Sequence, residues 1–198
     1  LFRNEVSYTI NKMPGGEMRH VAKQVIPPVE RGERVEGWVY LSWLDAFGMW
    51  NNNGVYSCNA DINRDDPTKF NTYAGNGALV AHEGKGMTTN FPINDGIFRM
   101  NFMLAKGSKA TVDLPQGMQL LLSDSQSRLS GAILDTKSKI LHKPNRNAYE
   151  GIGIWHTIVV ECCKESMEIK RVELGGVDIL SNIPITSKSE SMPIQIKS

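Results

Sequence analysis

Polar side chains at the end of one apolar run are the first residues of this sequence that could do chemistry. Residues 117–124 read GMQLLLSD. In a β-strand the apolar side chains at the even positions would share one face, and Gln119 would lie on the opposite face. Together with Asp124, this glutamine would form a polar surface suited to the hydroxyl groups of a sugar. The alternative is an outward glutamine followed by an ordinary acidic turn, because antiparallel sheets commonly have one solvated face.

His156 follows Trp155 in the run IWHTIVVEC, residues 154–162. Neighbouring residues of a strand point to opposite faces, so a Trp155 packed in the core would place His156 on the concave face of the sheet. An imidazole in that position can bind a ligand, transfer a proton or bind a metal. The alternative is a structural histidine whose ring nitrogens are satisfied by its surroundings.

The stretch WNNNG, residues 50–54, places an aromatic ring beside three carboxamides. Trp50 could cover the C–H face of a sugar ring, and Asn52 could hydrogen-bond to paired hydroxyl groups. A turn is the alternative interpretation, because asparagine tolerates the left-handed backbone conformation that many turns require.

Oxygen-bearing side chains alternate at Asp61, Asn63 and Asp65, as they do in a calcium-binding loop. The EF-hand pattern needs glycine at the sixth position and glutamate at the twelfth, where this chain has Asp66 and Thr72. An EF-hand is therefore excluded, and a looser calcium site or a solvated acidic turn remains. The sequence contains no Cys-x-x-Cys or His-x-x-x-His spacing, so it does not indicate a structural zinc site.

The three cysteines are too few for a disulfide framework. Cys162 and Cys163 are adjacent and would face opposite sides of a strand, so Cys58 could pair with at most one of them. The alternative is that all three are free and that the buried ones behave as small hydrophobic residues.

Composition limits the possible partners. The 198 residues include 22 basic and 21 acidic side chains, spread along the chain, with a net charge of +1. This balance argues against nucleic acid or an anionic membrane as the main partner, because both usually require a basic stripe. No apolar segment approaches the ~20 residues of a membrane-spanning helix. The sequence also lacks phosphate-binding and dinucleotide-binding motifs, so no cofactor is expected.

Short strands must position the polar residues described above. The clearest alternation lies in residues 96–105, GIFRMNFMLA, and predicts one buried face made of Phe98, Met100, Phe102 and Leu104. Similar runs predict strands at residues 37–44, 77–82, 109–113, 117–122, 131–134, 154–162, 168–174, 177–180 and 193–197. Many short strands separated by Gly, Asn, Asp and Pro are typical of an all-β, antiparallel β-sandwich or jelly roll.

The two ends of the chain differ from this pattern. Residues 1–36 are predicted to form an N-terminal extension, and residues 37–198 a single β-sandwich domain. Within the extension, apolar residues in 18–25 have helical spacing and predict one or two turns of helix, with a strand as the alternative interpretation of so short a run. A chain that begins at Leu1 fits either a removed leader or none. The last predicted strand ends close to Ser198, which leaves room for a further strand.

The order of motifs from Gly75 onward is similar to that of one known family. The segments that carry the similarity are, in order, GNGALVAHEGKGMTTNFPINDGIFRMNFML, LPQGMQLLLSDS, GAIL, HKPNRNAYEGIGIW, ELGGVDI and MPIQIKS. Over residues 37–198 the chain resembles the 3-keto-disaccharide hydrolase family, long called domain of unknown function 1080. The resemblance implies a concanavalin-like β-sandwich with a carbohydrate ligand on its concave sheet. It also implies an exported, extracellular or periplasmic location.

The chain departs from the family's pattern at positions that matter for chemistry. Aligning Asp124 and Ser125 with the family's Asp-Ser places Gln119 where a glutamate is usual and Leu121 where a glutamine is usual. His156 stands where the family has asparagine. A carboxamide does not exchange a proton near neutral pH, so Gln119 keeps hydrogen bonds to a sugar but loses the acid–base role of glutamate.

Three hypotheses follow. In the first, the protein hydrolyses glycosides, including sugars oxidised at the 3-position, and a base removes the acidified C2 proton. The candidates for this acid–base role are Asp113, Asp124 and His156, and the candidates for substrate binding are Gln119, Trp50 and Asn52. In the second, the same face belongs to a non-catalytic glycan-binding module. In the third, the sandwich is a structural or assembly domain.

Overall fold

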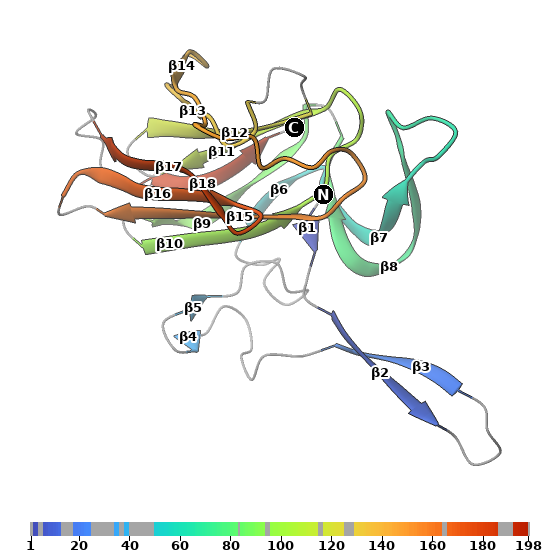
Figure 1. Ribbon diagram of the computed structural model, residues 1–198. Helices are drawn as coiled ribbons and strands as arrows, with labels where there is room; N and C mark the ends of the chain where they lie inside the picture. The colour runs from blue at the N-terminus through green and yellow to red at the C-terminus, as the bar shows by residue number, and fades with distance from the viewer. Residues whose placement is uncertain are drawn as a thin grey trace.

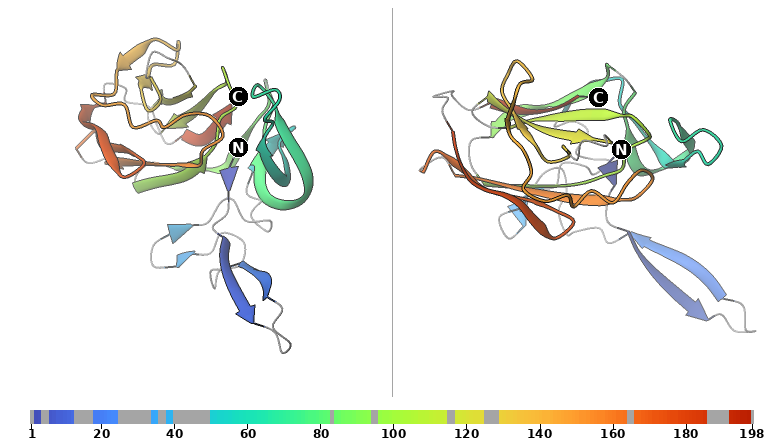
Figure 2. Two further views of the ribbon diagram at one scale, coloured as in Figure 1. Left: turned by 45° about the vertical axis from the view of Figure 1, so that its right-hand side comes forward. Right: turned by 45° about the horizontal axis from the view of Figure 1, so that its top comes forward.

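The computed structural model describes the polypeptide at residues 2–3, 6–12, 18–24, 34–35, 38–39, 50–82, 84–93, 96–114, 117–124, 129–163, 166–185 and 192–197. Regular structure in these residues is almost entirely antiparallel β-sheet, which confirms the predicted all-β class. Two seven-stranded sheets are stacked as the layers of a sandwich (Figures 1 and 2). Within the described part of the chain, no helix combines the length and the apolar character that crossing a membrane requires.

The first sheet has the strand order β17-β16-β15-β10-β1-β8-β7. Its strands are Phe2–Arg3 (β1), Tyr56–Ile62 (β7), Phe70–Val80 (β8), Gly96–Phe102 (β10), His156–Cys163 (β15), Glu168–Leu174 (β16) and Val177–Pro184 (β17). The second sheet has the order β14-β13-β12-β11-β18-β9-β6. Its strands are Trp50–Asn53 (β6), Gly86–Ile93 (β9), Lys109–Leu114 (β11), Met118–Ser123 (β12), Ile133–Leu134 (β13), Ile140–His142 (β14) and Met192–Lys197 (β18).

Period-2 alternation fills the space between the sheets with apolar side chains from both. The prediction for residues 96–105 is confirmed, because Met100, Phe102 and Leu104 are buried in this core and Phe98, partly buried, packs against it. β12 places three apolar side chains in the same core: Met118, Leu120 and Leu122. The opposite side of β12 carries Gln119, which is partly buried, together with Leu121 and Ser123, which are buried.

The N-terminal residues contribute strands. Met18–Gln24 (β3) pairs with Val6–Lys12 (β2) as an antiparallel hairpin that stands apart from the sandwich (Figure 1), so the strand interpretation of this stretch is correct. Arg34–Val35 (β4) and Trp38–Val39 (β5) form a second short pair. β1 lies in the first sheet between β10 and β8. The predicted boundary at residues 36 and 37 falls outside the described residues and stays a prediction, as does most of the strand expected at 37–44.

The last strand, β18, is inserted between β11 and β9. Gly86 on β9 lies opposite Lys197, and a Cβ at this glycine would collide with the backbone carbonyl oxygen of Ile196. Glycine therefore permits the close approach of the two strands. This insertion determines which side chains surround β11.

None of the three cysteines forms a disulfide bond with another described residue. Cys58 and Cys162 are buried in the sandwich, and burial raises the pKa of the Cys58 thiol. A raised pKa keeps the thiol protonated and therefore unreactive near neutral pH. The disulfide alternative is not realised in this structure.

Candidate functional site

Three polar side chains from adjacent strands meet on the outward face of the second sheet. Asp113 on β11 lies directly opposite Gln119 on β12, and Lys197 lies on β18, the other neighbour of β11. Gln119 Nε2 donates a hydrogen bond to Asp113 Oδ1 at 2.7 Å, and Lys197 Nζ lies 3.0 Å from Asp113 Oδ2. Both carboxylate oxygens of Asp113 therefore have a partner. We call these three residues the Asp113 cluster.

The Asp113 cluster lies at the border between buried and accessible surface. The side chain of Asp113 is 14% exposed and that of Lys197 is 45% exposed. Gln119 Oε1 is buried and has no hydrogen-bond partner among the described residues. An unpaired buried amide oxygen lowers the stability of the fold by about 1–3 kcal/mol, because its lost hydrogen bonds to water are not replaced. A hydrogen bond to this atom would therefore be stabilising. A hydroxyl group of a ligand can donate such a bond.

An apolar cluster borders the polar one on the same face. Leu121, two residues beyond Gln119, packs with Ala132 and Leu134, and Leu129 and Ile140 complete the group. Leu134 lies directly opposite Gln119 across β12 and β13. Leu121, Ala132 and Leu134 are buried, so this group is a small second core beside the Asp113 cluster, and only Leu129 and Ile140 are partly exposed.

Lys197 was not predicted as a site residue. Its signal in the sequence is only the alternation of the last strand, which places Gln195 and Lys197 on the side opposite the buried Ile194 and Ile196. The missing information is the strand order, because nothing local shows that the last strand lies next to β11.

Asp124 lies at the end of β12 and holds a neighbouring turn. Its Oδ2 accepts a hydrogen bond from the backbone N–H of Gly107 at 2.9 Å, and its own N–H donates to the carbonyl oxygen of Ser108. These contacts join β12 to the turn between β10 and β11. Asp124 therefore lies apart from Gln119, which is at the other end of the strand.

His156 begins β15 and faces the interior of the sandwich. It is 3% exposed, and its ring lies near the rings of Phe102 and Tyr149, with centroid distances of 5.5 and 4.6 Å. Its Nε2 is 3.1 Å from the carbonyl oxygen of Gly151. A carbonyl oxygen can only accept, so Nε2 carries a proton in this contact. The concave-face position depended on an inward Trp155, whereas here Trp155 is half-buried and His156 faces inward.

Tyr149 links the two acid–base candidates Asp124 and His156. It stacks against the ring of His156, and its hydroxyl oxygen is buried without a hydrogen bond of good geometry among the described residues. Burial raises the pKa of Tyr149, and the nearby Asp124 carboxylate raises it further. Tyr149 was missed at the sequence level because it lies in an irregular segment without any periodic pattern.

The second proposed binding stretch lies elsewhere. Trp50 on β6 is 8% exposed and belongs to the core, so its ring is not presented to a ligand in this structure. Asn52 is also on β6, but its side chain is outside the described residues, and its proposed role stays a prediction. The structure thus brings Asp113 together with Gln119, and Asp124 together with His156 through Tyr149.

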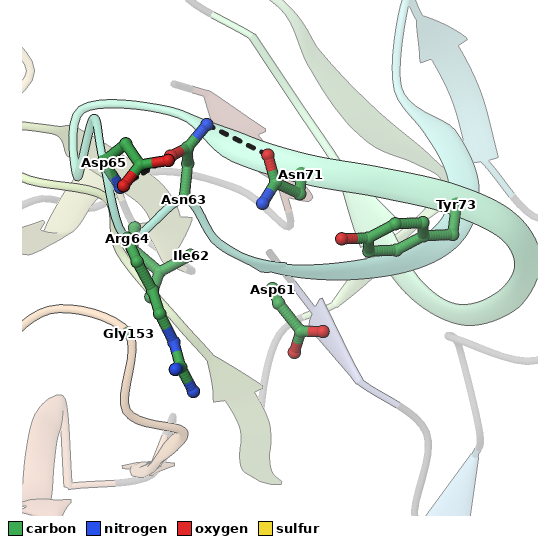
Figure 3. A pocket seen from close by; sticks show the side chains of 8 residues that line it. All are labelled: Asp61, Ile62, Asn63, Arg64, Asp65, Asn71, Tyr73 and Gly153. Carbon is green, nitrogen blue, oxygen red and sulfur yellow. Dashed lines mark hydrogen bonds between the residues drawn. The ribbon is translucent and has the colours of Figure 1, made fainter.

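An open pocket of about 710 Å³ lies at the end of the β7–β8 hairpin. Its walls are mainly polar, and Figure 3 shows the residues that line it: Asp61, Ile62, Asn63, Arg64, Asp65, Asn71, Tyr73 and Gly153. The pocket therefore includes all three residues of the calcium-loop pattern. Gly153 comes from the segment before β15 and closes the wall beside Ile62.

Asn63 has a structural task in this pocket. Its Oδ1 accepts hydrogen bonds from the backbone N–H groups of Asp65 and Asp66 at 2.9 and 3.0 Å, and its Nδ2 donates to Asn71 Oδ1 at 3.0 Å. The side-chain oxygen that a calcium ion would need is therefore already used to form the turn. Among the described residues, no group of three or more His, Cys, Asp or Glu side chains is arranged to hold a metal ion.

Asp66 stabilises the same turn. Lys69 Nζ lies 2.7 Å from its Oδ2, and the backbone and hydroxyl groups of Thr68 donate to its Oδ1. The bonds from Lys69 and Thr68 lower the pKa of Asp66 to about 2. These interactions hold the acidic turn in place, and residues of this turn form part of the pocket wall.

Comparisons with known proteins add little to this description. No family model and no curated protein matches the chain. Among solved structures, the chain is similar to a crystal structure described as a "putative glycosyl hydrolase" from Parabacteroides distasonis, with 14% sequence identity and a TM-score of 0.46. The similarity covers 63% of this chain and 66% of that one, so the chain spans about two thirds of that protein's length.

Proposed function

We propose that this protein is a carbohydrate-active sandwich protein of the glycoside hydrolase type, with the Asp113 cluster as its reactive centre. The observation that carries the proposal is the position of the Lys197 ammonium group, 3.0 Å from the Asp113 carboxylate, with Gln119 on the other carboxylate oxygen. The resemblance to the 3-keto-disaccharide hydrolase family supports the choice of substrate class.

A carboxylate beside an ammonium group suits proton abstraction next to a ketone. In a 3-keto-glycoside the ketone acidifies the C2–H bond, and Asp113 would take this proton. The resulting enolate places negative charge on the ketone oxygen, and the Lys197 ammonium group would stabilise it. When the enolate collapses, the C1–O bond breaks and its electron pair leaves with the departing sugar oxygen, which takes up a proton. Addition of water to the C1–C2 double bond completes the hydrolysis.

Gln119 would orient the substrate in this scheme. Its Nε2 already fixes Asp113, and its Oε1, buried and without a partner among the described residues, would accept a hydrogen bond from a sugar hydroxyl group after a shift of the side chains that cover it. We assign Asp124 and His156 to positioning, because Asp124 binds the Gly107 turn and His156 is almost fully buried. This assignment narrows three acid–base candidates to one.

A second candidate function is favoured by the residue type at Gln119. The resembled family has glutamate at this position, and a carboxamide retains binding while removing proton transfer. On this hypothesis the protein binds glycans through the same face and does not cleave them. Measurable turnover of a glycoside by the unaltered protein would distinguish a hydrolase from a glycan-binding protein.

The test is an assay of 3-keto-glycosides and ordinary glycosides with the intact chain and matched variants. We expect Asp113→Asn and Lys197→Met each to lower turnover of 3-keto-glycosides by ~10²-fold or more, the usual size of a general-base or charge-stabilisation effect. The exposed residues Asp178 and Lys170 provide the controls, as Asp178→Asn and Lys170→Met. Binding without turnover by the unaltered protein would favour the second candidate. Turnover that survives Asp113→Asn would overturn the assignment of the base.

A further inference from the structure

The pocket at the end of the β7–β8 hairpin is separate from the Asp113 cluster. It is formed by strands of the first sheet and the segment around Gly153, whereas the Asp113 cluster lies on the second sheet. None of its residues takes part in the function proposed above. The pocket is also preformed, because the Asn63 side chain fixes the turn and the Gly153 N–H donates to the carbonyl oxygen of Leu104.

The side chains of this pocket have unused hydrogen-bonding capacity. Asp61, Arg64 and Tyr73 have no side-chain hydrogen bond or ion pair among the described residues. Asn71 accepts from Asn63 through Oδ1, and Figure 3 shows its amide nitrogen turned away from that bond. The pocket therefore offers a carboxylate acceptor, an amide donor, a guanidinium donor and a phenol, all available to a ligand.

Tyr73 adds an apolar surface to these polar groups. It is 55% exposed, and in Figure 3 its ring extends over the pocket with the hydroxyl group directed toward the side of Asn71. An exposed aromatic ring on the wall of a polar pocket can pack against the C–H face of a sugar ring. Vicinal hydroxyl groups both donate and accept, so they match a carboxylate and an amide placed on the same wall.

Charge narrows the class of ligand further. Two carboxylates, Asp61 and Asp65, and one guanidinium group, Arg64, give the lining a net negative formal charge. A phosphorylated, sulfated or uronic sugar would be repelled by this balance, whereas a neutral sugar would not. We infer that this pocket is a binding site for a neutral pyranose unit, distinct from the Asp113 cluster, in which Tyr73 packs on the ring and Asp61 accepts its hydroxyl groups.

The experiment is an NMR titration of the isotope-labelled chain with methyl glucoside, methyl galactoside and methyl mannoside. We expect at least one of the three to shift the amide signals of residues 61–65, 71–73 and 153 in a saturable way. Tyr73→Ala should weaken this binding by about twofold to tenfold, because an aromatic contact of this kind contributes ~0.5–1.5 kcal/mol. Asp61→Asn should weaken it by about tenfold, the value of a hydrogen bond to a charged acceptor.

Two control variants separate loss of the ring from disturbance of the strand. Tyr56→Ala removes another exposed tyrosine from β7, and Thr72→Ala changes the residue next to Tyr73 on β8. Both should leave the affinity unchanged. Asp113→Asn should also leave it unchanged, so failure of the proposed hydrolysis and failure of this site are independent results.

Three outcomes would overturn the inference. These are the absence of saturable shifts at the pocket with all three glycosides, shifts confined to the face around Gln119, and an affinity that Tyr73→Ala does not alter. A separate titration with calcium chloride alone follows the three glycoside titrations. Saturable calcium shifts at residues 61–66 without any sugar binding would show that the pocket is a cation site instead.

Discussion

At the scale of single residues, the partners of each polar atom decide its role. Asp113, Asp124 and His156 are all candidates by residue type, and their surroundings in the fold differ. Asp113 has a carboxamide on one oxygen and an ammonium group on the other at a partly accessible surface. The Asp124 carboxylate accepts a hydrogen bond from a backbone N–H group. The His156 ring lies in the interior and is hydrogen-bonded to a backbone carbonyl oxygen. Only the first arrangement sets a carboxylate against a side-chain ammonium group.

Gln119→Glu tests this assignment at the residue that fixes Asp113. The new carboxylate would replace the amide donor that lies 2.7 Å from Asp113 Oδ1. Two adjacent carboxylates repel each other, and a shared proton relieves the repulsion at the expense of the free base. We therefore expect lower turnover of 3-keto-glycosides, measured as kcat/KM. An increase would mean that a carboxylate at position 119 is a better acid–base group than Asp113 and would contradict the assignment of Asp113.

Asp66 provides a prediction about pH. Its pKa is lowered from its ordinary value of 3.8 to about 2, so its interactions with Lys69 and Thr68 stabilise the fold above the ordinary pKa. This contribution is lost as the pH falls from about 4 toward about 2. NMR titration of the carboxyl groups should show Asp66 as one of the last to protonate. Lys69→Met should return its pKa toward the ordinary value, and an unchanged value would show that Lys69 is not the main cause.

At the scale of elements, strand order creates the sites. β18 joins two strands that are distant from it in sequence, and its position between β11 and β9 brings Lys197 to Asp113. The β7–β8 hairpin in turn positions the pocket, because residues 61 and 63 lie on β7 and the turn that follows it, and residues 71 and 73 on β8. Each site therefore depends on one pairing of strands.

Gly86→Ala tests the pairing of β9 with β18. The added Cβ would collide with the carbonyl oxygen of Ile196, so we expect a loss of about 1–3 kcal/mol in the free energy of unfolding. Hydrogen exchange should show faster exchange of the Ile194 and Ile196 amides. Gly84→Ala is the control, because its Cβ meets no atom within 4 Å and its positive φ of +72° gives local strain only. Equal exchange of the two amides in both variants would contradict the proposed role of Gly86.

At the scale of the whole molecule, one apolar core joins the two sheets. Buried side chains from both sheets contribute to it, and the largest fully buried one is Phe102. The ring of Phe102 also lies beside that of His156, so the buried histidine packs directly against the core. The outward faces carry the polar clusters and are free to vary without loss of this core.

Phe102→Ala should lower the free energy of unfolding by about 3–5 kcal/mol, because it leaves a cavity between the sheets. Urea unfolding is the measurement. Ile97→Ala on the same strand is the control, since Ile97 is 45% exposed and its truncation should change the stability by less than ~0.5 kcal/mol. Similar losses for both variants would contradict the two-sided pattern of β10.

The sequence by itself determined the fold class and the faces of its strands. Alternation at Phe98, Met100 and Phe102 requires one buried face, and the outward direction of Gln119 follows from the same period of two. Tertiary structure alone decided which strands lie side by side. It brought Lys197 to Asp113 and placed Tyr73 on the wall of a pocket, because long-range pairing depends on contacts that no local pattern encodes.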